Sequence, residues 1–472
     1  MRLKLGVVVC ATLALAATVA LARPLDPASA QSPGTTYSYL PLVTDNYSPP
    51  PAPVMANDPY FSDGSQWGLY NSGQNGGVPG ADVHAPQAWV ITTGGSDVTV
   101  AVVDSGVDAD HPDLVGKLLR GRNFVGGAPD PNDTDDDCGH GTHVAGIAAA
   151  SSNNAAGIAG VSWGARILPV KALYRDTSGR VIGYDSWIAN GIVYAADSGA
   201  EIINLSLGGT SVSPTLASAV DYAYERGILV VAAAGNCGDS SYPLNGCTSL
   251  NQWIYPAASA HTLAVAATDR QDLRASFSTQ ASYVDVAAPG ASIVSTYPDG
   301  YASLSGTSMA TPFVSGLAAL LLSRYPDYTP DQLARAIVMN ADDRGAPSYD
   351  NAFGCGRINA QRALSGGAVT SGCAGWSGVG SAVPTGAGAA AAAEDRAAGR
   401  PGSVLVKFKD RATAKARGLE HEVVPGLGIY EINVPPGQER AKQKELEGDP
   451  EVQFVQLDHL VYALEAGAAS LP

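Results

Sequence analysis

Between Val98 and Leu322, short β-branched runs alternate with runs of small, helix-forming residues. The expected strands are Val98–Val103, Ile202–Leu207 and Ile228–Ala234, and the expected helices are His140–Ala150, Trp187–Ala196 and Pro214–Arg226. Buried strands separated by helices predict an α/β fold, in which a parallel sheet is sandwiched between helices on both faces. Ligands of such sheets bind at the carboxyl ends of the strands, so the residues that follow each strand are the first candidates for a site.

The segments on either side of this region differ from it in composition. Arg2 and Lys4 precede an apolar run that ends in small-residue sites, the pattern of a secretory signal peptide; an uncleaved membrane anchor is the alternative. No later stretch is long and apolar enough to span a bilayer. The expected parts are a signal peptide (1–30), a proline-rich linker (31–56), the main domain (57–374), a Gly/Ala-rich linker (375–400) and a C-terminal unit (401–465).

The C-terminal unit has its own pattern of elements. Strand, helix, strand, helix and strand are expected at 404–409, 412–417, 427–434, 439–447 and 452–457. This order predicts a small α+β domain close to the lower size limit for independent folding.

Charge and cysteine content restrict the partners and the compartment. The net charge of −16 argues against a nucleic-acid partner, and it leaves carboxylates available for cations. Removal of the signal leaves two closely spaced cysteine pairs, Cys237 with Cys247 and Cys355 with Cys373, and one further cysteine, Cys138. In an oxidising compartment the pairs are natural disulfides, although spacing alone does not establish the pairing.

One short segment, Leu304–Pro312, holds a candidate nucleophile. Ser308 lies where an extended segment (301–305) gives way to an apolar helical run (313–322). The positive end of a helix favours negative charge that develops beside it. Serine is also a common helix cap, so Ser308 alone does not indicate catalysis. A serine nucleophile needs a base, and a further group that orients the base.

Candidates for those partners follow other strands and begin another helix. His140 stands between glycines at the start of an expected helix, and Asp104 ends the first buried strand. Asn236 follows the strand 228–234, where its amide can donate to an oxyanion together with the backbone N–H of Ser308. Each residue also has an ordinary structural explanation: a turn cap, a buried polar ring or a turn-forming asparagine.

Together the motifs Asp-Ser-Gly, His-Gly-Thr-His, Ala-Ala-Gly-Asn and Gly-Thr-Ser-Met-Ala-Thr-Pro resemble those of the subtilisin-like serine proteases. From residue 57 to about residue 364 the chain is most similar to the thermitase branch. The resemblance implies a serine endopeptidase of broad specificity that acts on proteins and peptides. In it Asp104 orients His140, which serves as base and then acid, Ser308 attacks the carbonyl, and Asn236 stabilises the oxyanion.

The same resemblance implies a peptide-binding cleft. Its expected lining residues are Ser206, Leu207, Gly208, Ala233, Ala234 and Gly235. The edge at Ser206–Gly208 suits pairing with an extended substrate, although an ordinary sheet edge has the same pattern. The loop after Asn236 is longer than in thermitase and carries Cys237 and Cys247, so we expect a reshaped wall of the primary specificity pocket.

Calcium is the cofactor that the resemblance implies, as a stabilising and not a catalytic ion. The matching ligand positions are Asp58, Asp113, Ser151, Asn154, Ala156 and Ile158. Carboxylates, an amide oxygen and backbone carbonyls are hard ligands that suit this ion.

The C-terminal unit resembles the propeptide, or inhibitor, domains of subtilases, which normally precede the catalytic domain. Here the unit follows it, and the expected fold is ferredoxin-like. We hypothesise that the unit folds against the protease, assists its folding and lays its tail, from about His459, in the cleft. The alternative is an appended domain that binds substrate or a surface.

Three other classes of protein fit the residues of this chain less well. A catalytically dead binding module usually lacks a triad residue, whereas this chain has every position. A carboxyl-type serine peptidase of the same fold would need a glutamate in place of His140 and an aspartate in place of Asn236. A metalloprotease would need a His-Glu-x-x-His run, which is absent. We therefore expect a secreted monomeric protease, with its own C-terminal domain as a partner and no membrane span after signal removal.

Overall fold

A computed structural model describes residues 51–239, 246–366, 373, 376, 378, 379 and 399–469. The expected signal peptide, most of the proline-rich linker and nearly all of the Gly/Ala-rich linker lie outside these residues. Within the described part of the chain, no helix has the length and apolarity that a membrane span requires.

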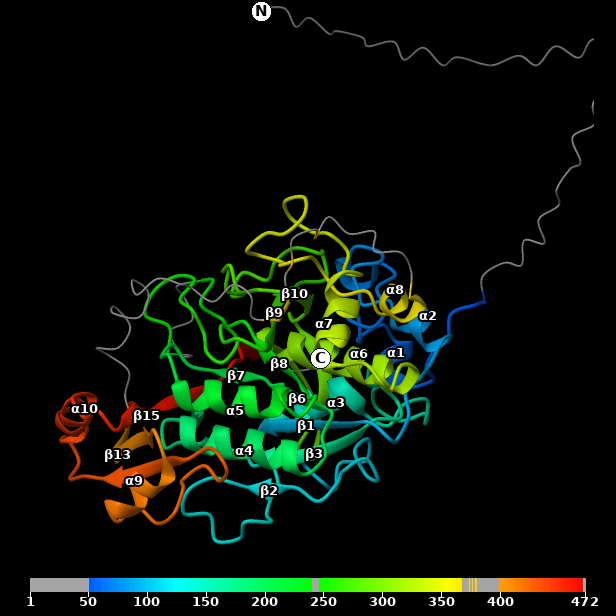
Figure 1. Ribbon diagram of the computed structural model, residues 1–472. Helices are drawn as coiled ribbons and strands as arrows, with labels where there is room; N and C mark the ends of the chain where they lie inside the picture. Colours follow the sequence, from blue (N-terminus) through cyan, green and yellow to red (C-terminus); the bar gives the residue numbers. More distant parts are fainter. Residues whose placement is uncertain are drawn as a thin grey trace, which may run out of the picture. The chain divides into compact units, whose positions relative to one another are not determined.

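A seven-stranded parallel sheet forms the centre of the main domain (Figure 1). Its strand order is β10-β9-β8-β6-β1-β3-β2. The strands are β10 (Val286–Pro289), β9 (Thr262–Thr268), β8 (Leu229–Ala233), β6 (Ile202–Leu205), β1 (Thr99–Asp104), β3 (Arg166–Lys171) and β2 (Arg122–Asn123). The expected parallel α/β architecture is confirmed.

Helices cover both faces because the central strands are apolar on both sides. In β1, Val100 and Val102 pack into one core cluster, and Ala101 and Val103 pack into the other. This split follows from the two-residue period of a strand. The first cluster includes α3 (His140–Ala149) and α6 (Thr307–Arg324), and the second includes α4 (Asp185–Asp197) and α5 (Pro214–Tyr224) (Figure 1).

Shorter elements surround this centre. They are α1 (Pro59–Ser62), η1 (Gln74–Gly76), α2 (Ala85–Trp89), α7 (Pro330–Val338), α8 (Ala360–Ser365), β4 (Tyr174–Arg175), β5 (Val181–Tyr184), β7 (Leu207–Gly208), β11 (Ile293–Tyr297) and β12 (Gly300–Ser305). Disulfides join Cys237 to Cys247 and Cys355 to Cys373, and Cys138 is free and buried.

The C-terminal unit is α+β, with a three-stranded antiparallel sheet. The strands β14 (Ile429–Asn433), β13 (Gly399–Phe408) and β15 (Val452–Ala463) lie in that order, with the helices α9 (Arg411–Ala416) and α10 (Glu439–Glu447). Val404, Val406, Phe408, Tyr430 and Leu446 are among the buried residues of its own small core.

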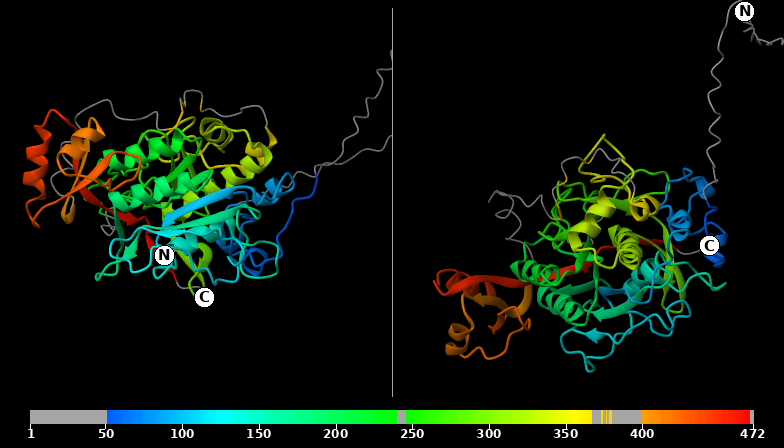
Figure 2. Two further views of the ribbon diagram at one scale, coloured as in Figure 1. Left: turned by 60° about the horizontal axis from the view of Figure 1, so that its bottom comes forward. Right: turned by 45° about the vertical axis from the view of Figure 1, so that its right-hand side comes forward.

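The last long strand extends beyond its predicted end at residue 457. Strand β15 continues to Ala463 and pairs antiparallel with β5 and β7 of the main domain (Figure 2). Beyond it, β16 (Gly467–Ala469) pairs antiparallel with β12. The extra length exists because the edges of β5 and β7 supply backbone partners that the C-terminal unit alone does not have.

Candidate active site

Asp104 and His140 form a buried pair at the carboxyl end of β1. His140 Nδ1 lies 2.7 Å from Asp104 Oδ1, and both side chains are almost completely buried. The helix that carries His140 can approach the strand end because a Cβ on Gly141 would lie 2.1 Å from the carbonyl oxygen of Gly106. Burial alone would lower the pKa of His140, but the Asp104 carboxylate outweighs it and raises this pKa to about 9.

Asp136, which lies in an acidic run of the sequence (130–137), organises the same region, a role that the sequence patterns did not predict. Its carboxylate accepts hydrogen bonds from Ser105 Oγ at 2.8 Å and from the backbone N–H groups of Gly139 and Thr142 at 2.8 Å. It therefore ties the end of β1 to the first turn of α3. A carboxylate just before a helix that begins among glycines is the signal that could have identified it.

His143, the second histidine of the His-Gly-Thr-His motif, is not positioned as a base. It is fully buried, and its Nε2 lies within hydrogen-bond distance of the carbonyl oxygens of Ile293 and Ala302. Burial lowers its pKa to about 3, so the ring is neutral at physiological pH.

Ser308 lies in the first turn of α6. This helix begins at Thr307, earlier than the predicted start at residue 313, although Pro312 lies inside it. A proline cannot donate to the carbonyl of the residue four positions earlier, which here is Ser308. Ser206 Oγ donates to that carbonyl instead, at 2.8 Å.

The hydroxyl of Ser308 donates to the backbone carbonyl of Ser206, also at 2.8 Å. Nε2 of His140 has no hydrogen-bond partner in the described part of the chain. The structure therefore joins the predicted acid and base directly, whereas the nucleophile is in a conformation that does not bond to the base.

Asn236 and the backbone N–H of Ser308 converge on one carbonyl oxygen, that of Leu464. The distances to this oxygen are 2.6 Å from Asn236 Nδ2 and 3.3 Å from Ser308 N. Asn236 Oδ1 accepts from the N–H of Thr307 at 3.0 Å, which orients the amide because that N–H can only donate. Two donors that share one oxygen have the arrangement that stabilises an oxyanion.

Four of the predicted cleft residues contact β15 or Leu464, the residue that follows this strand. β7, which contains Leu207 and Gly208, pairs with β15, and the carbonyl of Ser206 accepts from the N–H of Leu464 at 3.3 Å. The Leu464 side chain packs against Ala233.

The other two predicted cleft residues, Ala234 and Gly235, bond elsewhere. The carbonyl of Ala234 accepts from Tyr283 Oη, and the N–H of Gly235 donates to Thr307 Oγ1.

The Leu464 side chain is buried in a small apolar pocket. Besides Ala233, the pocket contains Cys237 and Ile254, with Cys247 packed against it. The disulfide in the loop after Asn236 thus forms part of the wall of this pocket.

The predicted calcium ligands lie together. Asp58 and Asp113 are fully buried, and both contact the loop 151–158. Asp58 accepts from the N–H of Asn153 at 2.8 Å, and Asp113 accepts from the N–H of Ile158 at 2.9 Å. Burial raises the pKa of Asp58, and the nearby Asp113 carboxylate raises it further. Two buried carboxylates close enough to repel each other, beside amide and carbonyl groups, fit a divalent cation with hard ligands.

The C-terminal unit also contacts the amino termini of α4 and α5. Asp458 accepts from the N–H and the hydroxyl of Ser186 at 2.9 and 2.8 Å, and Gln456 accepts from the N–H of Thr215 at 2.9 Å. These N–H groups lie in the first turns of the two helices, where no intrahelical acceptor exists.

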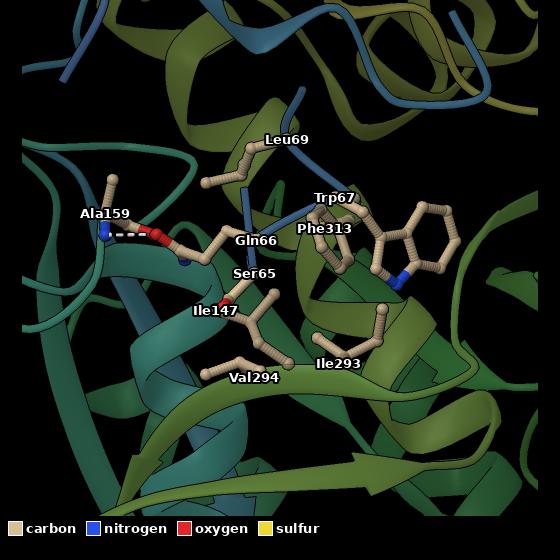
Figure 3. Close-up of a pocket in the computed structure, with 10 residues that line it drawn as sticks. Ser65, Gln66, Trp67, Leu69, Ile147, Ala159, Ile293, Val294 and Phe313 are labelled. Carbon is tan, nitrogen blue, oxygen red and sulfur yellow. Dashed lines mark hydrogen bonds between the residues drawn. The ribbon is translucent and has the colours of Figure 1, made fainter. Parts of the chain in front are cut away.

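A small cavity lies apart from these residues (Figure 3). Its accessible volume is about 10 Å³, roughly what one water molecule requires. Trp67, Ile147 and Phe313 are among its lining residues, and Gln66 hydrogen-bonds to the backbone of Ala159 at its edge (Figure 3). None of the predicted site residues lines it.

Comparison with known proteins places the chain in a class of enzymes. The model of the subtilase family matches residues 95–356. Thermitase from Thermoactinomyces vulgaris is 46% identical over 313 residues, which cover 65% of this chain and 98% of thermitase. A thermophilic serine proteinase from Bacillus sp. (strain AK1) is 46% identical over 310 residues, covering 65% of this chain and 69% of that protein.

A solved structure gives the same result. A protease from Pseudoalteromonas arctica superposes with a TM-score of 0.56 at 32% identity, covering 66% of this chain and 99% of that chain. The fold and the relatives together define a serine endopeptidase whose substrates are proteins. The chain belongs to the subtilase family, as the sequence motifs predicted.

Proposed function

We propose that this subtilase hydrolyses peptide bonds, with broad specificity, through a triad of Asp104, His140 and Ser308. The observation that carries the proposal is that Asn236 and Ser308 donate to the same carbonyl oxygen. A peptide carbonyl held in this way presents its carbon close to the serine that supplies one of the donors. The buried Asp104–His140 pair supplies the base, whose ring the Asp104 carboxylate orients through Nδ1.

In the proposed mechanism the Ser308 side chain first turns from the carbonyl of Ser206 toward Nε2 of His140. His140 takes the hydroxyl proton while Ser308 Oγ attacks the substrate carbonyl carbon. Asn236 and the Ser308 N–H stabilise the resulting oxyanion. His140 then gives the proton to the leaving amine, and water hydrolyses the acyl-enzyme by the same route.

Covalent labelling with a fluorophosphonate tests this mechanism. We expect one label per chain, mapped to Ser308, and no label on the Ser308→Ala variant. A label on another residue, or none on folded protein truncated after residue 463, in which Leu464 no longer occupies the oxyanion donors, would contradict the assignment.

We propose that calcium binds between Asp58, Asp113 and the loop 151–158, with Ser151, Asn154, Ala156 and Ile158 as the further ligands. The supporting observation is the burial of both carboxylates against this loop. When bound, the ion supplies positive charge that neutralises the two carboxylates and holds the loop. Chelation should then lower the unfolding temperature; an unchanged temperature would exclude a stabilising ion.

We propose that the C-terminal unit assists folding and inhibits the protease within one chain. It supports the protease fold by supplying acceptors to the first turns of α4 and α5. It supports inhibition by placing β15 on the edges of β5 and β7 and Leu464 against the oxyanion donors. Deletion of residues 401–472 should lower the yield of folded enzyme or raise early activity; no change in either would refute the proposal.

We propose further that residues 1–30 direct secretion, that residues 57–374 form the catalytic domain, and that the enzyme is monomeric. The signal pattern and two disulfides suit an oxidising compartment. Recovery from the medium with the first residues removed, at the mass of one chain, is the expected result. Retention in the cell or a larger assembly would contradict it.

A further inference from the structure

The chain does not stop at the carbonyl that the oxyanion donors hold. Upstream of it, Leu460, Val461 and Tyr462 pair with β5, and Ala463 pairs with Leu207 of β7. Downstream, the N–H of Ala466 donates to the carbonyl of Ser305, and β16 pairs with β12. The tail therefore crosses the site with backbone pairing on both sides, as a substrate chain does.

The peptide bond at the crossing point is the one between Leu464 and Glu465. The Leu464 carbonyl oxygen accepts from Asn236 Nδ2 and Ser308 N, and its side chain fills the apolar pocket. A Cβ on Gly306 would lie 2.2 Å from this oxygen and 2.9 Å from Glu465 Cα. The glycine thus allows the Leu464–Glu465 peptide to lie directly against the start of α6.

Glu465 lies close enough to His140 for the two charges to interact. Its carboxylate is one of the charges that raise the pKa of His140. The leaving amine of a cut at this bond is the backbone nitrogen of Glu465, so it belongs to a residue close to His140, which donates the proton.

We propose that the enzyme cuts its own chain between Leu464 and Glu465, and that this cut leaves the C-terminal unit bound as an inhibitor. The proposal rests on the catalytic function proposed above. Ser308 Oγ bonds to the carbonyl carbon of Leu464, the C–N bond to Glu465 breaks, and the nitrogen receives the serine proton through His140. Water then releases Ser308 and leaves a carboxylate on Leu464.

Retention follows from where the contacts lie. The pairing of β15 with β5 and β7 and the contacts of Gln456 and Asp458 all precede the cut. The new carboxylate on Leu464 stays beside the same two donors, and the released peptide begins at Glu465. Since the unit also remains covalently attached through residue 399, the cut removes only the tail and does not free the cleft.

The test uses the full chain and its intact mass. Wild-type protein should lose residues 465–472, whereas Ser308→Ala should keep them. Glu465→Pro should also keep them, because the proline ring replaces the hydrogen on the leaving nitrogen with Cδ and hinders the approach of His140 to that nitrogen. Glu465→Gln is the matched control that should still be cut. A mixture of Ser308→Ala with wild type should show cutting only of wild type, because the tail lies in its own cleft.

The activity of the cut protein tests retention. Wild type after cutting and uncut Glu465→Pro should hydrolyse a short peptide at rates that agree within about twofold. A rate more than tenfold higher for the cut protein would overturn retention. If a fluorophosphonate still labels Ser308 but the tail stays intact or is cut at another bond, the cleavage proposal alone is overturned. Absence of the cut, together with absence of a label on folded protein truncated after residue 463, would instead refute the catalytic function.

Discussion

Replacement of Leu464 by alanine tests directly how the tail is held in the cleft. The Leu464 side chain is fully buried against Ala233, Cys237 and Ile254. Alanine removes three carbon atoms from this contact, and each buried carbon contributes about 0.8 kcal/mol. The tail should therefore lose about 2.4 kcal/mol of its binding free energy.

Such a loss raises the ratio of open to closed molecules about 50-fold, since about 1.4 kcal/mol corresponds to a factor of ten. The assay is the initial rate of hydrolysis of a short chromogenic peptide at a concentration well below KM. The Leu464→Ala variant and its parent both carry Glu465→Pro, so that the tail stays intact. While the closed form dominates, the rate follows the open fraction. The variant should therefore be about 50 times as fast as its parent.

Gln453→Ala is the matched control, because Gln453 is exposed on the same strand. This control should leave the rate unchanged. If Leu464→Ala raises the rate less than twofold while its circular dichroism spectrum is unchanged, the side chain does not anchor the tail, and the reasoning from burial is wrong.

Three further predictions concern the oxyanion donor, the calcium site and the contact at Asp458. Asn236→Ala, made in the Leu464→Ala background, should lower kcat by about 10²–10³-fold with little change in KM. This range is established for the corresponding donor in subtilisin. Steady-state kinetics measures both parameters. Asp58→Asn should abolish the rise in unfolding temperature that calcium produces, whereas the exposed control Asp110→Asn should keep it; equal responses in a thermal melt would argue against the site.

The third prediction in this group is a pH effect. Burial raises the pKa of Asp458 to about 7 in the closed form, and Asp185 adds to this while Arg400 opposes it. The closed form then holds the Asp458 proton more tightly than the open form. Asp458 therefore adds to the stability of the closed form fully below about pH 4, and this stabilisation is lost as the pH rises through about 7. Inhibition should weaken as the pH rises over this interval. Asp458→Asn should not show this weakening, so the ratio of wild-type activity to variant activity should rise with pH over the same interval. Parallel activity–pH profiles would contradict the prediction.

Local patterns were sufficient to predict the centre of the fold. The apolar runs that became β1, β6 and β8 are buried on both faces, and the predicted helices lie within a few residues of α3, α4 and α5. Boundaries were less accurate: α6 begins at Thr307 and not at Phe313, because Ser206 supplies the donor that Pro312 lacks. That compensation comes from another strand, and the residues around Pro312 contain no sign of it.

The candidate site divides in the same way. The sequence by itself predicted Asp104, His140, Asn236 and Ser308 as candidates, because each lies in a short motif at the end of a strand or the start of a helix. It did not predict the role of Asp136, whose partners come from two separate elements.

Only the tertiary structure decided that β15 continues to Ala463 and brings the carbonyl of Leu464 to Asn236. The physical reason is that the length and register of an antiparallel pair depend on both strands. The partners of β15 in β5 and β7 lie more than 200 positions away along the chain.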